Sequence, residues 1–289
     1  MENPENKIKS LNLWRGPVTL TPLSGGITNV NYLAKDATGR YVVRLGDDIP
    51  QHQVMRFNEL AASRAAHAAG ISPAVVHSQP GILVLEHIPS HTLSAEDVRS
   101  EKYLKKTLAL IKTCHREVAK HLRGPVLVFW VFHVLRDYAW TLRKGRSQYL
   151  ARLPELLEKA DRLEKLSGPF DITFCHNDLL PANLLDGGER LWLIDWDYAG
   201  FNSPLFDLGG LAANCAFSDS QEIWLLENYF EQPVTDELLS RYRAMKCASL
   251  LREAMWSMVS EIHSKIDFDF VTYTAENLAG FEKAYSDIN

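Results

Sequence analysis

The stretch that most constrains this chain runs from residue 174 to residue 197. It places Asp178 and Asn183 within the segment HNDLLPAN (176–183), and Asp195 follows twelve residues after Asn183. Each of these polar residues stands at the end of a short apolar segment. The pattern predicts a fold that brings the three side chains together at one edge of a packed core.

The residues after Asn183 predict a β-hairpin. The apolar run LWLI (191–194) is typical of a buried strand, which would deliver Asp195 into a cleft at its end. Leu184 and Leu185, before the turn DGG (186–188), are its expected hairpin partner.

These residue types and spacings indicate phosphoryl transfer. That reaction asks a protein mainly to position the acceptor hydroxyl and to hold Mg²⁺ against the phosphate charge. Asp178 is predicted to accept the acceptor's proton, and Asn183 and Asp195 offer the hard oxygen ligands that Mg²⁺ prefers. The H-x-D-x-x-x-x-N spacing parallels the protein-kinase catalytic loop, with IDWD where kinases carry DFG. The alternative is that these Asp and Asn residues are ordinary turn residues and that the imidazole of His176 is hydrogen-bonded within the core.

Composition excludes several classes of partner. The chain has 289 residues and a net charge of −5, without a run rich in lysine and arginine, so we expect no nucleic-acid partner. No run is long and apolar enough to span a bilayer, and the polar N-terminus does not resemble a secretory signal. Four scattered cysteines without metal-ligand spacing suit a reducing compartment, so we expect a cytoplasmic protein that binds small molecules.

A glycine-bearing turn precedes this region, between two segments that alternate like strands. Its residues are Ser24, Gly25, Gly26, Thr28 and Asn29. Paired glycines let backbone N–H groups approach a polyphosphate, and the Thr28 and Asn29 side chains would add contacts or brace the turn. Taken alone, such a turn is more often only a hairpin connection.

Two further features complete a predicted nucleotide site. Arg44 ends the third strand, where a cation would reach the α- and β-phosphates, and Glu59 on the following helix is its expected partner. The alternative is an exposed arginine and a solvated glutamate. The backbone of Glu86, His87 and Ile88, where the chain leaves the small lobe, is expected to meet the adenine ring.

The composition shifts near residue 90 from strands to helices, with Ser94 as the expected cap of the first helix and helical spacing over residues 98–118. In the small lobe, one helix is expected from about residue 51 to residue 69. We therefore expect an α+β, bilobal fold, with an N-terminal nucleotide-binding lobe at 1–90 and a mainly helical catalytic and acceptor-binding lobe at 91–289. Asp207, near a helix start, is predicted to accept backbone N–H groups of the catalytic loop. Trp256 and Tyr273 would suit an organic cation, although their pattern alone favours packing.

Several segments together resemble the choline/ethanolamine kinase family, within the aminoglycoside-phosphotransferase-like group that shares the protein-kinase fold. The similarity runs nearly end to end. It is carried by SGGITN (24–29), YVVRLG (41–46), LEHIPSHTL (85–93), HNDLLPAN (176–183), LIDWDYAGFN (193–202), FDLG (206–209) and MWSMVSEIHSKIDFDFVTY (255–273).

The resemblance implies ATP- and Mg²⁺-dependent phosphorylation of an amino alcohol such as choline or ethanolamine. Asp178 would be the base, and Asn183 and Asp195 the metal ligands. The implied acceptor site comprises Asp178, Asp197, Asn214, Glu253, Trp256 and Tyr273. The resemblance leaves open whether the chain forms a homodimer.

The sequence also departs from the family pattern. Ser24 stands where many members carry an arginine beside the glycines, and Leu180 replaces a polar residue of the catalytic loop. Asn214 stands where eukaryotic members carry a pocket glutamate, and Glu253 where they carry a further tryptophan. A pocket with one aromatic residue fewer and a displaced carboxylate is expected to favour a different cation.

Two alternatives remain beside an amino-alcohol kinase. One keeps the fold and changes the acceptor, giving an aminoglycoside or thiamine kinase, which predicts a wide acidic cleft. The other is a nucleotide-binding scaffold without catalysis, although neither the predicted base nor a predicted metal ligand is missing.

Overall fold

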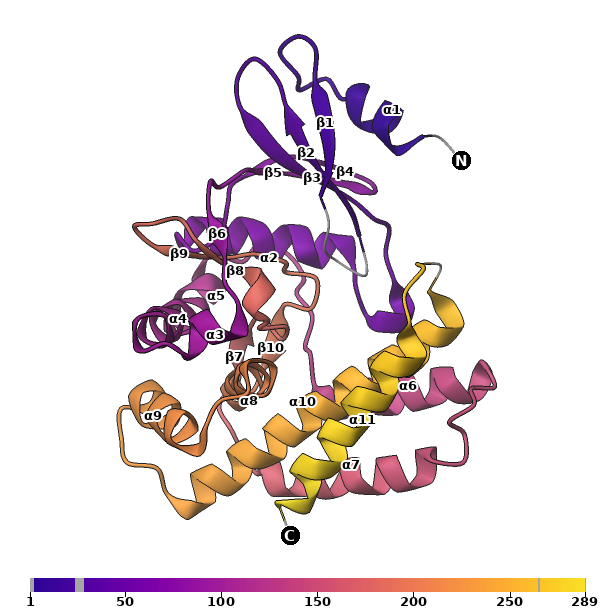
Figure 1. Ribbon diagram of the computed structural model, residues 1–289, viewed down its shortest axis with the longest axis vertical. Helices are drawn as coiled ribbons and strands as arrows, with labels where there is room; N and C mark the ends of the chain where they lie inside the picture. The colour runs from indigo at the N-terminus through magenta and orange to yellow at the C-terminus, as the bar shows by residue number, and fades with distance from the viewer. Residues whose placement is uncertain (1–2, 24–28, 265, 289) are drawn as a thin grey trace.

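The computed structural model describes residues 3–23, 29–264 and 266–288 and has two lobes of unequal size (Figure 1). A small lobe built on a β-sheet stands above a larger, mainly helical lobe. Helix α2 (Arg56–Ala68) lies between the two, and the long helices α10 (Asp236–His263) and α11 (Phe270–Ser286) cross the large lobe side by side.

The small-lobe sheet is antiparallel, with the strand order β1-β2-β3-β5-β4. Its five strands are β1 (Thr19–Leu23), β2 (Val30–Lys35), β3 (Arg40–Leu45), β4 (Val75–Gln79) and β5 (Ile82–Glu86). Alternating side chains point to opposite faces of a strand, so Tyr32 and Ala34 of β2 reach the same small core as Val43 and Val84. Helix α1 (Pro4–Lys9) closes that core with Ile8.

Short strands in the large lobe carry the loops of interest. Strands β6 (His91–Thr92), β8 (Leu184–Asp186) and β9 (Leu191–Leu193) form one sheet, and β7 (Thr173–Cys175) pairs with β10 (Gly200–Asn202). The hairpin predicted across residues 186–188 is confirmed, with Leu184 opposite Leu193.

Helices make up most of the large lobe. They are α3 (Ala95–Arg99), α4 (Glu101–Thr113), α5 (Ala119–His121), α6 (Val131–Lys144), α7 (Leu153–Ser167), α8 (Pro204–Cys215), α9 (Asp219–Phe230), α10 (Asp236–His263) and α11 (Phe270–Ser286), with a π-helical turn at Cys114–Val118 and 3₁₀ turns at Pro50–His52 and Pro181–Asn183. The predicted Ser94 cap is confirmed as a capping box with Asp97.

Two predicted helices are shorter than expected. The helix expected from residue 51 begins at Arg56, because the 3₁₀ turn ends in Gln53, whose φ of 59° is left-handed. The helix expected from residue 98 to residue 118 is divided, because extended Ser100 ends α3 and caps α4.

Hydrophobic packing does not follow the chain order. Helix α2 (Arg56–Ala68) precedes residue 90, yet Ala62, Ala65 and Ala66 pack into the core of the large lobe. Small side chains allow this close approach. The lobe boundary near residue 90 therefore stays a prediction, because α2 precedes it and packs with the core of the large lobe.

Helix α10 lies at the centre of the helical packing of the large lobe, where it contacts α6, α7, α8 and α11. It meets α8 at Gly209, where an added Cβ would lie 2.7 Å from the Cα of Lys246. Within the described residues, no helix is both long and apolar enough to cross a membrane.

His52 ties the segment before α2 to the large lobe. Its Nδ1 lies 3.4 Å from the Tyr138 hydroxyl of α6, and its Nε2 lies 3.1 Å from Ser260 Oγ of α10. Burial, together with the charges of Arg252 and His263, lowers the pKa of His52 to about 3. The imidazole is therefore neutral in the folded chain at any pH well above that value.

We predict that His52 makes the fold acid-sensitive. In the unfolded chain His52 binds a proton near pH 6.5, whereas in the folded chain it does so only near pH 3. The contribution of His52 to the free energy of unfolding is therefore complete above pH 6.5. Below pH 6.5 this contribution falls by about 1.4 kcal/mol per pH unit until about pH 3. Urea unfolding between about pH 8 and pH 4.5 measures this slope. His52→Gln should flatten it.

Tyr138→Phe is the matched control, because it removes a partner hydroxyl and keeps the imidazole. It should lower the free energy of unfolding by about 1 kcal/mol and keep the slope. Equal slopes for the parent chain and His52→Gln would contradict the prediction.

Candidate active site

The predicted catalytic loop is anchored by Asp207 of α8. Its Oδ2 accepts the backbone N–H of His176 at 2.8 Å, and its Oδ1 accepts that of Asn177 at 2.7 Å. The predicted role of Asp207 is confirmed. Asn177 has a left-handed φ of 63°, and its amide donates to the carbonyls of Tyr198 and Gly200. The loop before Asp178 is therefore fixed by buried hydrogen bonds.

The hairpin register places Asn183 and Asp195 at the same end of β8 and β9. The backbone N–H of Ile194 donates to the Asn183 carbonyl at 3.1 Å, and Asp195 follows with a left-handed φ of 69°. The Asn183 amide nitrogen donates to the Asp178 carbonyl at 3.0 Å. One hydrogen-bonded turn thus holds the three predicted residues together.

The donor set of Asn183 and Asp195 fits Mg²⁺. The amide nitrogen of Asn183 is used by Asp178, which leaves the amide oxygen for a ligand. The carboxyl of Asp195 is 30% exposed and lines the cleft. Hard oxygen donors of this kind suit a small divalent cation.

Asp178 has the character of a proton acceptor. Burial raises the pKa of Asp178, and Arg252 lowers it, while Glu253, Asp195 and Asp197 raise it further; the resulting pKa is about 7. Its side chain is still 20% exposed on the cleft. A carboxyl with a pKa near the working pH is suited to general base catalysis.

Behind the cleft lies a buried network of charges. The guanidinium of Arg44 lies 2.8 Å from Asp195, 3.2 Å from Asp197 and 3.3 Å from Glu59. The predicted pair of Arg44 and Glu59 is therefore present and buried, not solvated. Carboxylates from α2 and from the segment after β9 meet on this one arginine.

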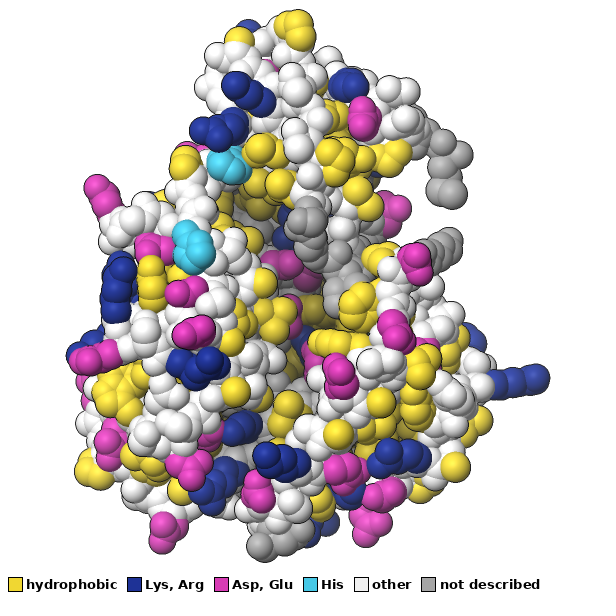
Figure 2. All heavy atoms as spheres, viewed as in Figure 1, with side chains coloured by type: hydrophobic (Ala, Val, Ile, Leu, Met, Phe, Trp, Pro, Cys, Tyr) yellow, Lys and Arg dark blue, Asp and Glu magenta, His cyan; other side chains and the backbone are white. Residues whose placement is uncertain are grey.

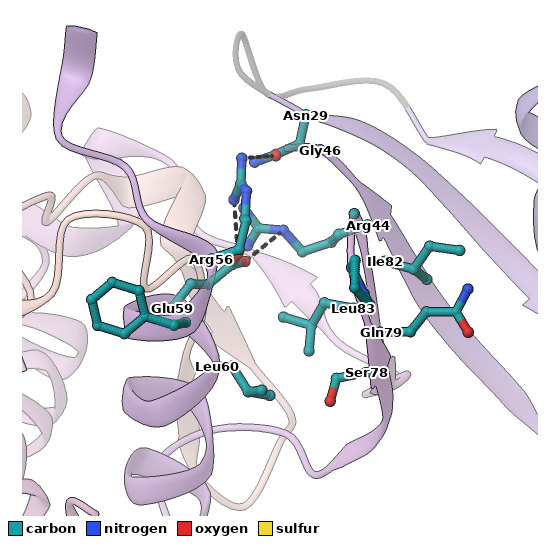
Figure 3. A pocket seen from close by; sticks show the side chains of 13 residues that line it. Asn29, Arg44, Gly46, Arg56, Glu59, Leu60, Ser78, Gln79, Ile82 and Leu83 are labelled. Atoms are coloured by element: carbon teal, nitrogen blue, oxygen red, sulfur yellow. Dashed lines mark hydrogen bonds and ion pairs between the residues drawn. The ribbon is translucent and has the colours of Figure 1, made fainter. Parts of the chain in front are cut away.

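Arg56 belongs to the same network, and the sequence analysis missed it. Its Nη1 lies 2.7 Å from Glu59 and 2.9 Å from Asp197, and its Nη2 donates to Asn29 at 2.7 Å. Figure 3 shows Arg56 between Asn29 and Glu59. These residues line a cavity of about 250 Å³. Its position one helical turn before Glu59 is the signal that would have revealed it.

Burial and charge oppose each other throughout the network. Burial and Asp197 raise the pKa of Glu59 to about 7, although Arg44 and Arg56 lower it. Burial also acts to raise the pKa of Asp197, but Arg44 and Arg56 outweigh it and hold that pKa below its usual value. Burial alone would lower the pKa of Arg44, whereas Asp195, Asp197 and Glu59 raise it.

The cleft between the lobes has a volume of about 740 Å³ and is lined by Asp178, Asn183, Asp195 and Arg44. Figure 2 shows a hollow at this level with acidic side chains inside it. The predicted adenine linker, residues 86–88, lines the same cleft. The backbone N–H groups of Glu86 and His87 donate to the carbonyls of Ala74 and Arg40. Among the described linker residues 86–88, the backbone N–H of Ile88 is therefore the one that is available to a ligand.

The glycine turn is only partly described. Ser24, Gly25, Gly26 and Thr28 lie outside the described residues. Asn29 is buried, and its amide donates to Asp197 at 3.0 Å while its oxygen accepts from Arg56. The start of the second strand is thus tied to the large lobe.

The other end of the cleft is formed by α10 and α11. Glu253, Trp256 and Tyr273 line it, and the Tyr273 hydroxyl donates to Glu253 at 2.8 Å. Asn214 instead lines a small adjoining recess with Asp178 and Glu253, and its amide donates to Leu179.

Arg252 is the second residue that the sequence analysis missed. Its guanidinium is buried, 2.6 Å from Glu253 and 3.5 Å from Asp178. It also lies over the Tyr198 ring, 4.5 Å from the centroid. A charged pair within the apolar segment LLREAMW (250–256) is the signal that was available.

Two lobes with these side chains in the cleft between them define a kinase-like phosphotransferase. The chain belongs to the phosphotransferase enzyme family, whose model matches residues 19–253. The resemblance stated from the sequence, the protein-kinase-like fold and the class of a phosphotransferase with an alcohol acceptor are confirmed.

Individual relatives agree with this membership. Protein LicA of Haemophilus influenzae is 25% identical over 262 residues, covering 88% of this chain and 76% of the relative. A probable ethanolamine kinase of Arabidopsis thaliana is 26% identical, covering 87% and 75%. The crystal structure of choline kinase LicA from Streptococcus pneumoniae matches with a TM-score of 0.76 and 26% identity, over 96% of this chain and 97% of that one.

We predict that Arg56→Gln destabilises the chain, because Glu59 and Asp197 lose a buried partner. The free energy of unfolding should fall by about 3 kcal/mol, measured by urea unfolding. Arg64→Gln, on the exposed side of the same helix, is the control and should change it by less than about 0.5 kcal/mol. Equal effects of the two substitutions would show that Arg56 does not support the network.

Proposed function

We propose that this chain transfers the γ-phosphoryl group of ATP to the hydroxyl of a small amino alcohol. The observation that carries the proposal is the position of Asp178. It shares one cleft with the oxygen donors Asn183 and Asp195 and with the carboxylate and aromatic groups of α10 and α11.

In this proposal Asp178 accepts the proton of the acceptor hydroxyl, whose oxygen attacks the γ-phosphorus as the bond to the leaving ADP breaks. Asp178 is suited to this step because its raised pKa and partial exposure leave it basic and accessible. Asn183 fixes the Asp178 backbone and holds the loop in place.

Asn183 and Asp195 would hold Mg²⁺, which supplies charge stabilisation at the phosphate oxygens when bound. Arg44 now pairs with Asp195, so phosphate contact requires this guanidinium to share its donors between the carboxylate and the nucleotide. The Ile88 N–H and the linker backbone would face the adenine ring. A homodimer and a cytoplasmic location stay predictions from the sequence.

An acceptor panel tests the reaction. ATP consumption would be measured with ethanolamine, choline, thiamine and an aminoglycoside, each at saturating Mg·ATP. We expect turnover with at least one of the two amino alcohols. Turnover confined to thiamine or the aminoglycoside would show that the proposed acceptor class is wrong. The absence of turnover with any hydroxylated amine would refute the kinase and favour a nucleotide-binding scaffold without catalysis.

We predict that Asp178→Asn lowers kcat by about 100-fold or more, because the acceptor hydroxyl loses its base. The dissociation constant of Mg·ATP, measured by calorimetry, should stay within about threefold, since Asp178 is not assigned to the metal.

Asp171→Asn supplies the control, because Asp171 is exposed seven residues earlier and lies outside the cleft. Undiminished turnover by Asp178→Asn would exclude the assignment of the base.

A further inference from the structure

The acceptor end of the cleft has an arrangement of charge that the sequence did not suggest. Arg252 and Glu253 are neighbours on α10, and both face Asp178 at the cleft. One end of the Arg252 guanidinium lies 3.5 Å from Asp178, and the other lies 2.6 Å from Glu253. A single buried cation therefore spans the distance between the proposed base and a second carboxylate.

The charges of this corner do not cancel. When both carboxyls are ionised, Asp178 and Glu253 carry two negative charges against the one positive charge of Arg252. Glu253 is 23% exposed, whereas Arg252 is 5% exposed, so the carboxylate is the group that an acceptor can reach. The corner thus attracts one further cation, and Glu253 is the place for it.

Aromatic faces contribute little to this cation site. The Tyr198 ring is covered by the Arg252 guanidinium. Trp256 is 4% exposed, its N–H donates to the Tyr198 hydroxyl, and His52 lies 5.1 Å from it between ring centroids. A quaternary ammonium is bound mainly by several open aromatic faces. Among the described residues at this end of the cleft, Tyr273 alone is a partly exposed ring, because Tyr198 and Trp256 are covered.

Hydrogen-bonding capacity remains on Glu253 instead. Its two oxygens accept one bond each from Tyr273 and Arg252, out of about four lone-pair sites on a carboxylate. An ammonium with N–H groups can use the rest, whereas a trimethylammonium would cover them without a bond. A site built to hydrogen-bond a group rejects analogues that lack it.

We propose that the preferred acceptor is an amino alcohol whose ammonium retains N–H donors, of the ethanolamine type, and that Glu253 accepts its hydrogen bond. Arg252 is the positioning residue that orients Glu253 relative to Asp178. Because one guanidinium bridges the two carboxylates, a two-carbon amino alcohol with a hydrogen bond at each end can span them. This inference rests on the proposed kinase function and names the acceptor within it.

The test is a methylation series with the parent chain. The value of kcat/KM is measured for ethanolamine, its N-methyl and N,N-dimethyl derivatives, and choline, at saturating Mg·ATP. The value for ethanolamine should exceed that for choline by about tenfold or more, because the third methyl group removes the last N–H. A choline value within about threefold of the ethanolamine value, or above it, overturns the inference.

Glu253→Gln tests the residue itself, since it keeps the size of the side chain and removes the charge and one acceptor oxygen. The value of kcat/KM for ethanolamine should fall by about 10- to 100-fold, mainly through KM. The ratio of ethanolamine to choline should fall by about fivefold or more. An unchanged ratio overturns the role of Glu253. Glu276→Gln, exposed on α11, is the matched control and should leave both values unchanged.

Two further measurements keep the outcome decisive. If Glu253→Gln does not fold, Tyr273→Phe removes only the hydroxyl that holds Glu253, and it should raise the KM for ethanolamine more than that for choline. Calorimetric binding of both amines separates the two proposals. Preferential binding of ethanolamine without phosphorylation refutes the kinase and keeps only the recognition of the ammonium by Glu253. Turnover that favours choline keeps the kinase and refutes the inference. No binding of either amine refutes the inference.

Discussion

The structure depends on buried carboxylates that are held by two arginines. Glu59 of α2 and Asp197 of the large lobe have almost no exposed surface, so their charges would be costly without Arg44 and Arg56. Arg44 comes from the sheet and Arg56 from α2, whereas Asp195 and Asp197 follow β9. The ion pairs therefore fix the relative position of sheet, helix and catalytic loop, and a proposed metal ligand is part of the same network.

The large lobe uses a second buried carboxylate in a different way. Asp207 pairs with His115 at 3.0 Å and accepts two backbone N–H groups, which a neutral side chain of this size cannot match. This anchor holds the loop rigid, so that Asp178 can be partly desolvated and retain a raised pKa. The two acids thus have different roles. Asp207 is fully paired and stabilises the loop, whereas Asp178 faces the cleft.

The end of the cleft at α10 and α11 departs from the family pattern in a side chain and not in the fold. At residue 253 a carboxylate stands where the family resemblance leads one to expect an aromatic ring, and the preceding Arg252 compensates part of its charge. Arg252 also occupies the face of Tyr198. Helix α10 packs against α6, α7, α8 and α11, and Glu253 lies on its side that lines the cleft.

The sequence by itself determined the two-lobed fold, the hairpin after Asn183, the Ser94 cap and the role of Asp207. These features depend on local periodicity and on short motifs whose spacing sets their geometry. Tertiary structure alone decided that α2 packs with the large-lobe core, that Arg56 joins Asn29 to Asp197, and that Arg252 lies between Asp178 and Glu253. Asn29, Arg56 and Asp197 are separated by up to 168 residues, and no periodic pattern in a chain reports such a contact. Burial gives these contacts their strength, because the charges that meet there have no water to replace the partner.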